Sequence, residues 1–261
     1  PQWLAKQGYV SHQSGKWWEG SFERGGFTAG MSQGFPNPRG RHGDAGLKIG
    51  RDGMEPVLDF IDRSVAADNP FFVWYAPFLP HTPHNPPARL FEKYQAKGVP
   101  DRIAKYYAMC EWFDETCGQL LDYLDKKKLT DNTMIVYICD NGWGSMGRGS
   151  VKASPHEQGV RTPIMIKWPG KVSPQVDKEN LASNIDIVPT ILAAAGVEIP
   201  KELPGIDLLD FNTVNNRDSI FLGCFTHDML DVNRPEAGLR ARSYVGKKWK
   251  LTVMEYTRSK A

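Results

Sequence analysis

Apolar residues recur every three or four positions in two stretches of the chain, and this spacing predicts two amphipathic helices. The first helix is expected over residues 53–67 and the second, which is longer, over residues 101–128. In the first stretch the apolar positions are Met54, Val57, Leu58, Ile61 and Val65. The second stretch also carries an acidic face with Glu111, Asp114 and Glu115, which we interpret as a solvated face.

Short apolar runs, rich in β-branched and aromatic residues, predict buried strands between and after these helices. The runs cover residues 71–75, 133–139 and 164–168, and a further short strand is expected to start at Tyr9 and Val10. A third helix is expected over residues 184–196, with Asp186 as its N-cap and a glycine at its end. This alternation of strands and helices predicts an α/β fold with a parallel or mixed sheet.

The pattern changes after about residue 198, where loops and short strands replace the long periodic segments. Residues 219–222 and 248–253 are expected to be strands of a smaller second sheet. We therefore predict a core domain over residues 1–210 and the start of a smaller C-terminal subdomain over residues 211–261.

The region from Gly25 to Gly53 is rich in glycine and arginine and lacks apolar periodicity, so it is expected to be a long loop. Arg41 and His42 lie in this loop. A guanidinium group matches the geometry of a sulfate or carboxylate, which makes both residues candidates for binding an anionic substrate. A solvated loop held by salt bridges explains the same residues equally well.

The composition is that of an ordinary globular protein, with 41% hydrophobic and 24% charged residues. A formal net charge of +2 gives no reason to expect nucleic acid or a membrane surface as a partner. Cys110, Cys117 and Cys139 fall at apolar positions, where small core side chains are expected. No Cys-x-x-Cys spacing indicates zinc or a redox pair, and no disulfide framework is expected.

The strand predicted over residues 133–139 is followed at once by Asp140, Asn141 and Gly142. In open α/β sheets, ligands bind outside the carboxyl ends of the strands, where this pair would lie. The carboxylate and amide oxygens suit a cation that takes oxygen ligands, such as calcium. A simple turn after a strand is the structural alternative, since Asn and Asp favour turns.

The segment that follows contains Lys152, then Glu157 five positions later, then Gly159, Arg161 and Pro163, and it ends in Trp168-Pro-Gly. This ordered set, together with Asp140-Asn141-Gly142, resembles the sulfatase family of the alkaline-phosphatase-like superfamily. Two further segments extend the resemblance. Lys16 lies in a Gly-Lys-Trp segment, and His81 lies in a Pro-His-x-Pro segment directly after a predicted strand.

The resemblance implies an alkaline-phosphatase-like mixed or parallel sheet flanked by helices, and an enzyme that cleaves a small-molecule or carbohydrate sulfate ester. It implies that Asp140 and Asn141 bind Ca²⁺, that Lys16 and Lys152 neutralise the sulfate, and that His81 contacts the sulfate and protonates the leaving group. We interpret Glu157 and Arg161 as a buried or half-buried structural pair that shapes the loop carrying Lys152. The family resemblance points to a secreted or periplasmic location, which the sequence itself does not reveal.

Two departures from the family pattern affect these expectations. Trp18 stands where the family usually has a histidine, and indole does not exchange a proton near neutral pH. The Cys/Ser-x-Pro-Ser-Arg motif that the family converts to formylglycine does not occur in the 261 residues, and the family's N-terminal pair of acidic calcium ligands is missing as well. We therefore expect the chain to be cut upstream of Pro1 and to have no sulfatase turnover alone.

Two other functions stay open. A phosphoesterase or phosphonate hydrolase of the same superfamily would use transition metals, but several of those enzymes place a histidine directly after the strand-end Asp, and imidazole suits zinc or manganese. Asn141 therefore favours a sulfatase. A non-catalytic homologue that binds sulfated glycans is the second alternative, and Trp18 is the residue that supports it.

Overall fold

The computed structural model describes residues 1–17, 20–34, 45–142, 152, 154–226 and 230–255. Three residues singled out from the sequence, Trp18, Arg41 and His42, lie outside the described residues. The chain divides into two compact units, Pro1–Thr130 and Asp131–Ala261. The boundary expected near residue 210 stays a prediction.

A parallel three-stranded sheet organises the first unit. Its central strand is β1 (Val10–Gly15), which pairs with β2 (Ala29–Gly30) on one side and β3 (Phe71–Ala76) on the other. The register of β1 and β3 runs from Val10 opposite Phe71 to Gly15 opposite Ala76. Both strands therefore end at the same edge of the sheet, which is the edge where a functional site is expected.

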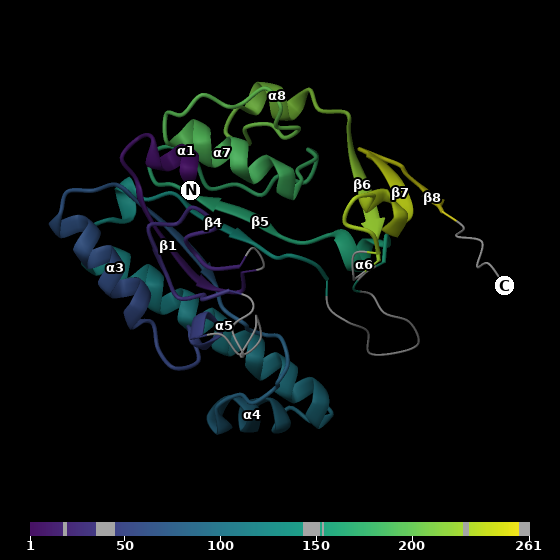
Figure 1. The fold of residues 1–261 in the computed structure, drawn as a ribbon. Helices are drawn as coiled ribbons and strands as arrows, with labels where there is room; N and C mark the ends of the chain where they lie inside the picture. The colour runs from purple at the N-terminus through teal and green to yellow at the C-terminus, as the bar shows by residue number, and fades with distance from the viewer. Residues whose placement is uncertain (18–19, 35–44, 143–151, 153, 227–229, 256–261) are drawn as a thin grey trace. The chain divides into compact units, whose positions relative to one another are not determined.

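Helices cover this sheet and extend away from it (Figure 1). Helix α3 (Glu55–Ala66) packs on β1 and β3 through buried side chains that include Val57 and Ile61. The longest helix, α5 (Asp101–Lys126), confirms the second periodic stretch, as α3 confirms the first. The unit also contains α1 (Gln2–Ala5), the 3-10 helix η1 (Ala45–Lys48) and α4 (Ala88–Gln95), and the 3-10 helix η2 (Thr130–Asn132) follows α5 at the boundary between the units.

The acidic face of α5 is only partly solvated, which corrects the prediction. Helix α4 packs against α5 (Figure 1) and carries the basic partners of two of its carboxylates. Arg89 donates two hydrogen bonds of 2.6 Å to Glu115, and Lys93 forms an ion pair with Glu111. Asp114 is exposed, as predicted. The acidic face therefore serves in part to attach α4, an element that the sequence pattern did not predict.

The second unit contains a separate antiparallel pair of strands, β4 (Ile135–Ile138) and β5 (Ile164–Lys167). Both fall within predicted strands, but neither is fully buried: half-buried positions stand beside exposed ones such as Ile138 and Met165. The helix expected over residues 184–196 is present as the 3-10 turn η3 (Asn184–Asp186) followed by α7 (Ile187–Ala194). The second unit also contains two shorter helices, α6 (Glu157–Val160) and α8 (Phe211–Asn215).

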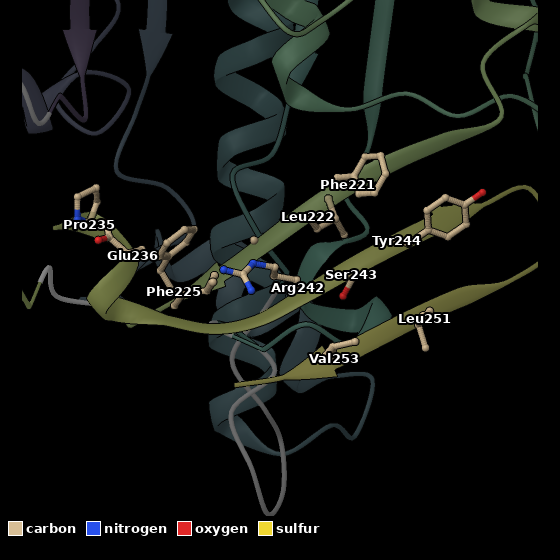
Figure 2. A pocket seen from close by; sticks show the side chains of 12 residues that line it. Phe221, Leu222, Phe225, Pro235, Glu236, Arg242, Ser243, Tyr244, Leu251 and Val253 are labelled. Carbon is tan, nitrogen blue, oxygen red and sulfur yellow. The ribbon is translucent and has the colours of Figure 1, made fainter. Parts of the chain in front are cut away.

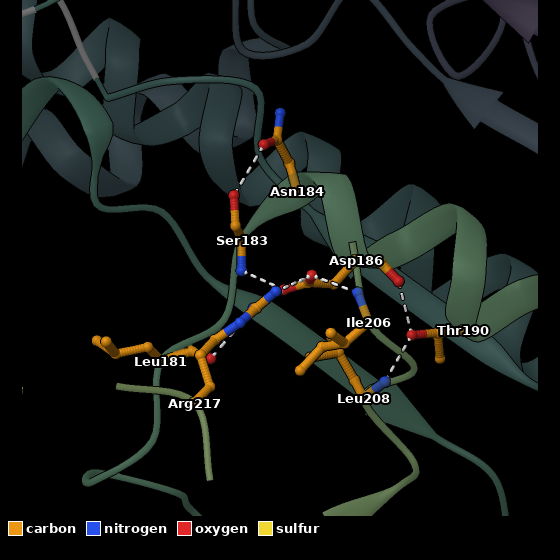
Figure 3. A network of polar contacts seen from close by, with 8 residues as sticks. All are labelled: Leu181, Ser183, Asn184, Asp186, Thr190, Ile206, Leu208 and Arg217. Atoms are coloured by element: carbon orange, nitrogen blue, oxygen red, sulfur yellow. Dashed lines mark hydrogen bonds and ion pairs between the residues drawn. The ribbon is translucent and has the colours of Figure 1, made fainter. Parts of the chain in front are cut away.

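Asp186 occupies the N-cap position of α7, as predicted, but its side chain makes no capping hydrogen bond to that helix. Ser183 is the N-cap residue of η3, and the fully buried Asp186 carboxylate accepts from its backbone N–H at 2.7 Å. The same carboxylate accepts from Ile206 N at 3.0 Å and from both terminal nitrogens of Arg217 at 2.6 and 2.8 Å (Figure 3). Asp186 thus joins three separate segments of the unit through one buried group.

A three-stranded antiparallel sheet forms the C-terminal part of this unit. Its strands are β6 (Ser219–Phe225), β7 (Leu239–Gly246) and β8 (Lys250–Met254), in that order, and the 3-10 helix η4 (Pro235–Gly238) precedes β7. The first and last of these strands were predicted, and the middle one was not.

All four cysteines are free thiols, which agrees with the absence of an expected disulfide framework. Cys110, Cys117 and Cys139 are half-buried and not fully enclosed in the core. Burial raises the pKa of Cys117 to about 11, so this thiol stays protonated at neutral pH.

In the part of the chain that the structure describes, no helix has the length and apolar character needed to span a membrane.

Candidate functional site

Lys16 and the loop that carries His81 start at the same edge of the parallel sheet. Lys16 follows β1 directly, and its backbone N–H donates to the carbonyl of Ala76, the last residue of β3, at 2.6 Å. His81 lies in the loop that leaves β3 at this point. The structure therefore brings together the carboxyl ends of the two strands from which these candidate residues extend.

Gly15 makes this close approach of the strand ends possible. Its φ is +81°, and a Cβ at this position would lie 1.8 Å from the carbonyl oxygen of Ala76. Any side chain here would separate the two strand ends. The indole Nε1 of Trp74 also donates to the carbonyl of Lys16 at 3.3 Å, so the backbone of this lysine is held from two sides.

The side chain of His81 is exposed, and its ring lies against Phe78 with the centroids 4.3 Å apart. Its Nδ1 lies 2.9 Å from the carbonyl oxygen of Thr82. A carbonyl can only accept, so Nδ1 carries a proton in this contact. The other ring nitrogen, Nε2, is therefore the atom that would exchange a proton with a substrate.

His84 is a second imidazole in the same loop. Burial lowers the pKa of His84 from its ordinary value of 6.5, and the charges of His81 and Arg51 act in the same direction. Its ring centroid lies 5.8 Å from that of Tyr106 on α5. This shift favours the neutral form of the His84 imidazole.

The two candidate metal ligands lie at the end of β4 in the second unit. Asp140 is exposed and Asn141 is half-buried. The amide nitrogen of Asn141 donates to the carbonyl of Gly142 at 2.9 Å, which directs the amide oxygen away from that carbonyl. Both residues therefore present oxygen atoms at the carboxyl end of a strand, as expected from the sequence.

The turn formed by these residues packs directly on the backbone of α6. The N–H of Gly142 donates to the carbonyl of Gly159 at 3.0 Å. A Cβ on Gly142 would lie 1.7 Å from the carbonyl oxygen of Gln158. The Asp-Asn-Gly turn and the Glu-Gln-Gly segment, which are separated by 14 residues between Gly142 and Glu157, are thus in direct contact.

Lys152 is half-buried and precedes this short helix. The predicted pair of Glu157 with Arg161 is wrong. Glu157 instead forms an ion pair with Lys250 of β8 at 3.0 Å, and Arg161 is exposed. The reason is local: α6 ends at Val160, and Arg161 has an extended backbone, so the two side chains do not share a helical face.

The donor chemistry of Asp140 and Asn141 fits calcium, but only as part of a site. Calcium takes six to eight oxygen ligands, and these two side chains offer one carboxylate and one amide oxygen. Within the described ranges, no group of three or more His, Cys, Asp or Glu side chains is placed to hold a metal ion. The remaining ligands would have to come from elsewhere.

A hollow of about 620 Å³ lies on the C-terminal sheet (Figure 2). Its walls are mainly apolar side chains of β6, β7 and β8, including Phe221, Tyr244 and Leu251. The rings of Phe221 and Tyr244 meet edge to face at 5.6 Å. None of the candidate catalytic or metal-binding residues lines this hollow, so we assign it no part in the chemistry.

Two cations that contact the candidate loops were missed in the sequence. Arg51 binds the loop around His81, and Lys250 binds the segment between Lys152 and α6. Neither belongs to a motif. Arg51 lies in a Gly-Arg-Asp-Gly turn and Lys250 in a predicted strand, and only the folded chain shows what they contact.

Comparison with known proteins gives a consistent result. The family model described as Sulfatase matches residues 1–197, and the model described as N-sulphoglucosamine sulphohydrolase, C-terminal, matches residues 152–258. The uncharacterized sulfatase YdeN of Escherichia coli is 30% identical over 164 residues, which cover 59% of this chain and 29% of that protein. Arylsulfatase A of Homo sapiens is 30% identical over 160 residues, which cover 58% of this chain and 30% of that protein.

Among solved structures, Ps i-CgsB in complex with k-i-k-neocarrahexaose superposes with a TM-score of 0.73 at 20% identity, covering 97% of this chain and 64% of that chain. This similarity confirms the predicted alkaline-phosphatase-like α/β fold. The matched region spans less than a third of the length of the two curated relatives.

Proposed function

The chain belongs to the sulfatase family, and from this premise we propose that the full-length protein hydrolyses a sulfate monoester. One observation supports this most directly: the candidate residues Lys16, His81 and Asp140 each lie beyond the carboxyl end of a strand, namely β1, β3 and β4. Ligands of α/β enzymes commonly bind beyond the carboxyl ends of strands, so each of these positions suits a functional residue.

A sulfated carbohydrate is the substrate class that we propose. The match of residues 152–258 to the N-sulphoglucosamine sulphohydrolase model supports a sugar sulfate, and so does the similarity to an enzyme structure that holds a neocarrahexaose. Arg41 and His42 are proposed to bind this anionic substrate. Loss of sulfated-oligosaccharide binding in Arg41→Ala would support this assignment, and unchanged binding would remove Arg41 from it.

The proposed roles follow from the charge that the reaction moves. The ammonium groups of Lys16 and Lys152 neutralise the sulfate oxygens, because preorganised positive charge stabilises the negative charge that develops in the transition state. His81 donates a proton from Nε2 to the departing oxygen, which spares the leaving group from departing as an alkoxide.

Two groups complete the proposed site. Asp140 and Asn141 would contribute ligands to a Ca²⁺ ion, which when bound supplies positive charge that polarises a sulfate oxygen. The nucleophile is expected to be a formylglycine outside these 261 residues. The nucleophilic step would therefore need the full-length protein. The candidate residues of this chain would bind the sulfate, neutralise its charge and protonate the departing oxygen.

Turnover of an aryl sulfate by the full-length protein tests the proposal. We expect activity that a calcium chelator removes and added Ca²⁺ restores. Lys152→Ala should reduce kcat strongly, whereas Lys171→Ala, which removes an exposed lysine from a turn, should not. Hydrolysis of a phosphonate monoester without sulfatase activity would favour the phosphonate hydrolase reading. Binding of a sulfated oligosaccharide without any turnover would favour a non-catalytic homologue.

A further inference from the structure

The guanidinium group of Arg51 binds several points of the loop that carries His81. Its Nη2 donates to the carbonyl of Phe78 at 2.8 Å and approaches the carbonyls of His81 and Pro83 at 3.3 and 3.5 Å. Its Nη1 donates to the side-chain oxygen of Asn85. One planar group with several donors thus connects residues on both sides of the candidate catalytic histidine.

Arg51 itself is held in place from two directions. It belongs to a tight turn in which the N–H of Gly50 donates to the carbonyl of Gly53 at 2.9 Å, and its own N–H donates to the carbonyl of Lys48 at 3.0 Å. Its guanidinium carbon lies 5.6 Å from the ring centroid of Trp112 on α5. Burial lowers the pKa of Arg51, but an arginine remains charged throughout the physiological range.

The composition of the loop explains why it needs an external donor. Prolines occupy five of the eleven positions from 77 to 87, and proline has no backbone N–H. The loop can therefore donate few hydrogen bonds to its own carbonyls, and the carbonyl of the buried Phe78 in particular requires a donor. Arg51 supplies this donor to the segment from Phe78 to Pro83.

We propose that Arg51 is a positioning residue that fixes the His81 loop, so that the imidazole meets the departing oxygen of the substrate. This inference rests on the proposed sulfatase function. Arg51 acts through the loop backbone and is not itself expected to touch the substrate. A lysine cannot replace it fully, because a single ammonium group does not present donors in the planar fork that spans these carbonyls.

The full-length enzyme with Arg51→Lys and Arg51→Met provides the test, using two substrates that differ in their need for an acid. Nitrophenyl sulfate has a good leaving group, whereas a sugar sulfate needs protonation of its departing oxygen. General acid catalysis contributes on the order of 10²- to 10⁴-fold, so misplacing the acid should lower kcat on the sugar sulfate by roughly 10- to 100-fold. The loss on nitrophenyl sulfate should be only a few-fold, and Arg51→Lys should be less affected than Arg51→Met.

Arg89→Met is the matched control, since it removes a paired arginine from α4 without touching this loop. It should leave the ratio of the two activities unchanged. Equal losses on both substrates in the Arg51 variants would overturn the proposal, because a general loss of folded protein has no preference for a leaving group. Should Arg51→Met fail to fold, Arg51→Lys alone carries the comparison.

Hydrogen exchange supplies a readout that does not depend on turnover. The amides between Phe78 and Asn85 should exchange faster in the Arg51 variants, while those of α5 stay protected. Unchanged exchange in the loop would show that Arg51 does not hold it and would overturn the inference. An inactive wild-type enzyme would remove the proposed sulfatase function, and faster exchange would still establish the anchoring contact.

Discussion

The imidazole of His12 is buried in an environment that disfavours its charged form. It lies in the central strand β1 with 4% of its surface exposed, and its ring centroid is 5.1 Å from that of Phe60. Its Nδ1 is buried and has no hydrogen-bond partner. Burial lowers the pKa of His12 from 6.5 to about 4, and the charge of Arg63 acts in the same direction. The imidazole is therefore neutral in the folded state at pH 7.

This shift predicts an acid-sensitive fold. Between pH 6.5 and 4 the unfolded chain binds a proton at His12 and the folded chain does not, so the free energy of unfolding falls as the pH is lowered through this range. Lowering the pKa of His12 from 6.5 to about 4 corresponds to roughly 3 kcal/mol of folding free energy. Denaturant titrations of His12→Leu should show a shallower dependence on pH than the wild type. Parallel pH curves for the two proteins would contradict the assignment to His12.

Gly142 is a second residue with a testable local environment, because an added Cβ would clash with a neighbouring backbone carbonyl. Gly142→Ala places a Cβ 1.7 Å from the carbonyl oxygen of Gln158, so the turn that carries Asp140 must move away from α6. We expect a loss of stability of about 2–4 kcal/mol and a weaker response of the full-length enzyme to Ca²⁺. Thermal unfolding and a calcium titration of activity measure the two effects.

Gly118→Ala is the control for this substitution. Gly118 lies within α5 and has open space where its Cβ would be, so alanine should stabilise the helix slightly. If both variants lost the same stability, steric contact with Gln158 would not be the cause.

At the scale of whole elements, the sequence predicted those whose stability comes from their own apolar pattern. The helices α3 and α5 and the strand β3 were predicted for this reason. The central strand β1 was predicted from its start at Tyr9 and Val10, but its apolar pattern did not reveal its burial, because Ser11, His12, Gln13 and Ser14 are polar and nevertheless buried. Hydrogen bonds outside the strand pattern hold some of them: Gln13 accepts from the distant Ser32 N at 3.0 Å and donates to Gly15 O at 3.0 Å.

The candidate site was likewise predictable only where a local sequence pattern marks its residues. The sequence placed Lys16, His81 and Asp140 after strands because each follows a local motif or an apolar run. It did not show that Arg51 and Lys250 hold the neighbouring loops, since these contacts join residues far apart in the chain. Contacts of this kind depend on the fold and leave no periodic signal.

The ion pair between the buried Asp186 and Arg217 predicts that loss of the Arg217 charge strongly lowers the stability of the fold. Arg217→Met leaves the fully buried Asp186 carboxylate without its charged partner (Figure 3), which costs about 3–5 kcal/mol in comparable cases. Chemical denaturation should reveal this loss. Arg234→Met removes an exposed ion pair with Asp231 and should change stability little. Similar stability of the two variants would show that burial does not determine the effect.

Lys250 connects the C-terminal sheet to the segment that follows Lys152. Its Nζ donates to the carbonyl of the buried Pro155 at 2.6 Å and pairs with the exposed Glu157 at 3.0 Å. Lys250→Met should lower stability by about 2 kcal/mol, since it removes a charged donor from a partly buried carbonyl. Glu157→Gln removes only the exposed pair and should have a smaller effect in the same denaturation experiment. The opposite order would assign the contact to Glu157.

At the scale of the whole molecule, the chain holds only part of the proposed chemistry. The sulfatase family model covers residues 1–197, yet the described residues provide two candidate calcium ligands and no formylglycine motif is present in the sequence. In the proposed reaction, Lys16 and Lys152 would supply positive charge and His81 would donate a proton. Under the proposed function, the nucleophile and the other oxygen ligands would have to come from outside the described residues.

This division predicts how calcium binding depends on chain length. The described part of a polypeptide of residues 1–261 provides Asp140 and Asn141 as candidate side-chain ligands, fewer than calcium requires, so its Kd should be about 10⁻³ M or weaker, and it should show no turnover. The full-length enzyme should bind Ca²⁺ more tightly by at least an order of magnitude. Calorimetric titration of both proteins, with Asp140→Ala in each, measures the contribution of this carboxylate. Equal affinity of the two proteins would mean that Asp140 and Asn141 do not share a site with ligands from the missing part, and the proposed calcium site would then be wrong.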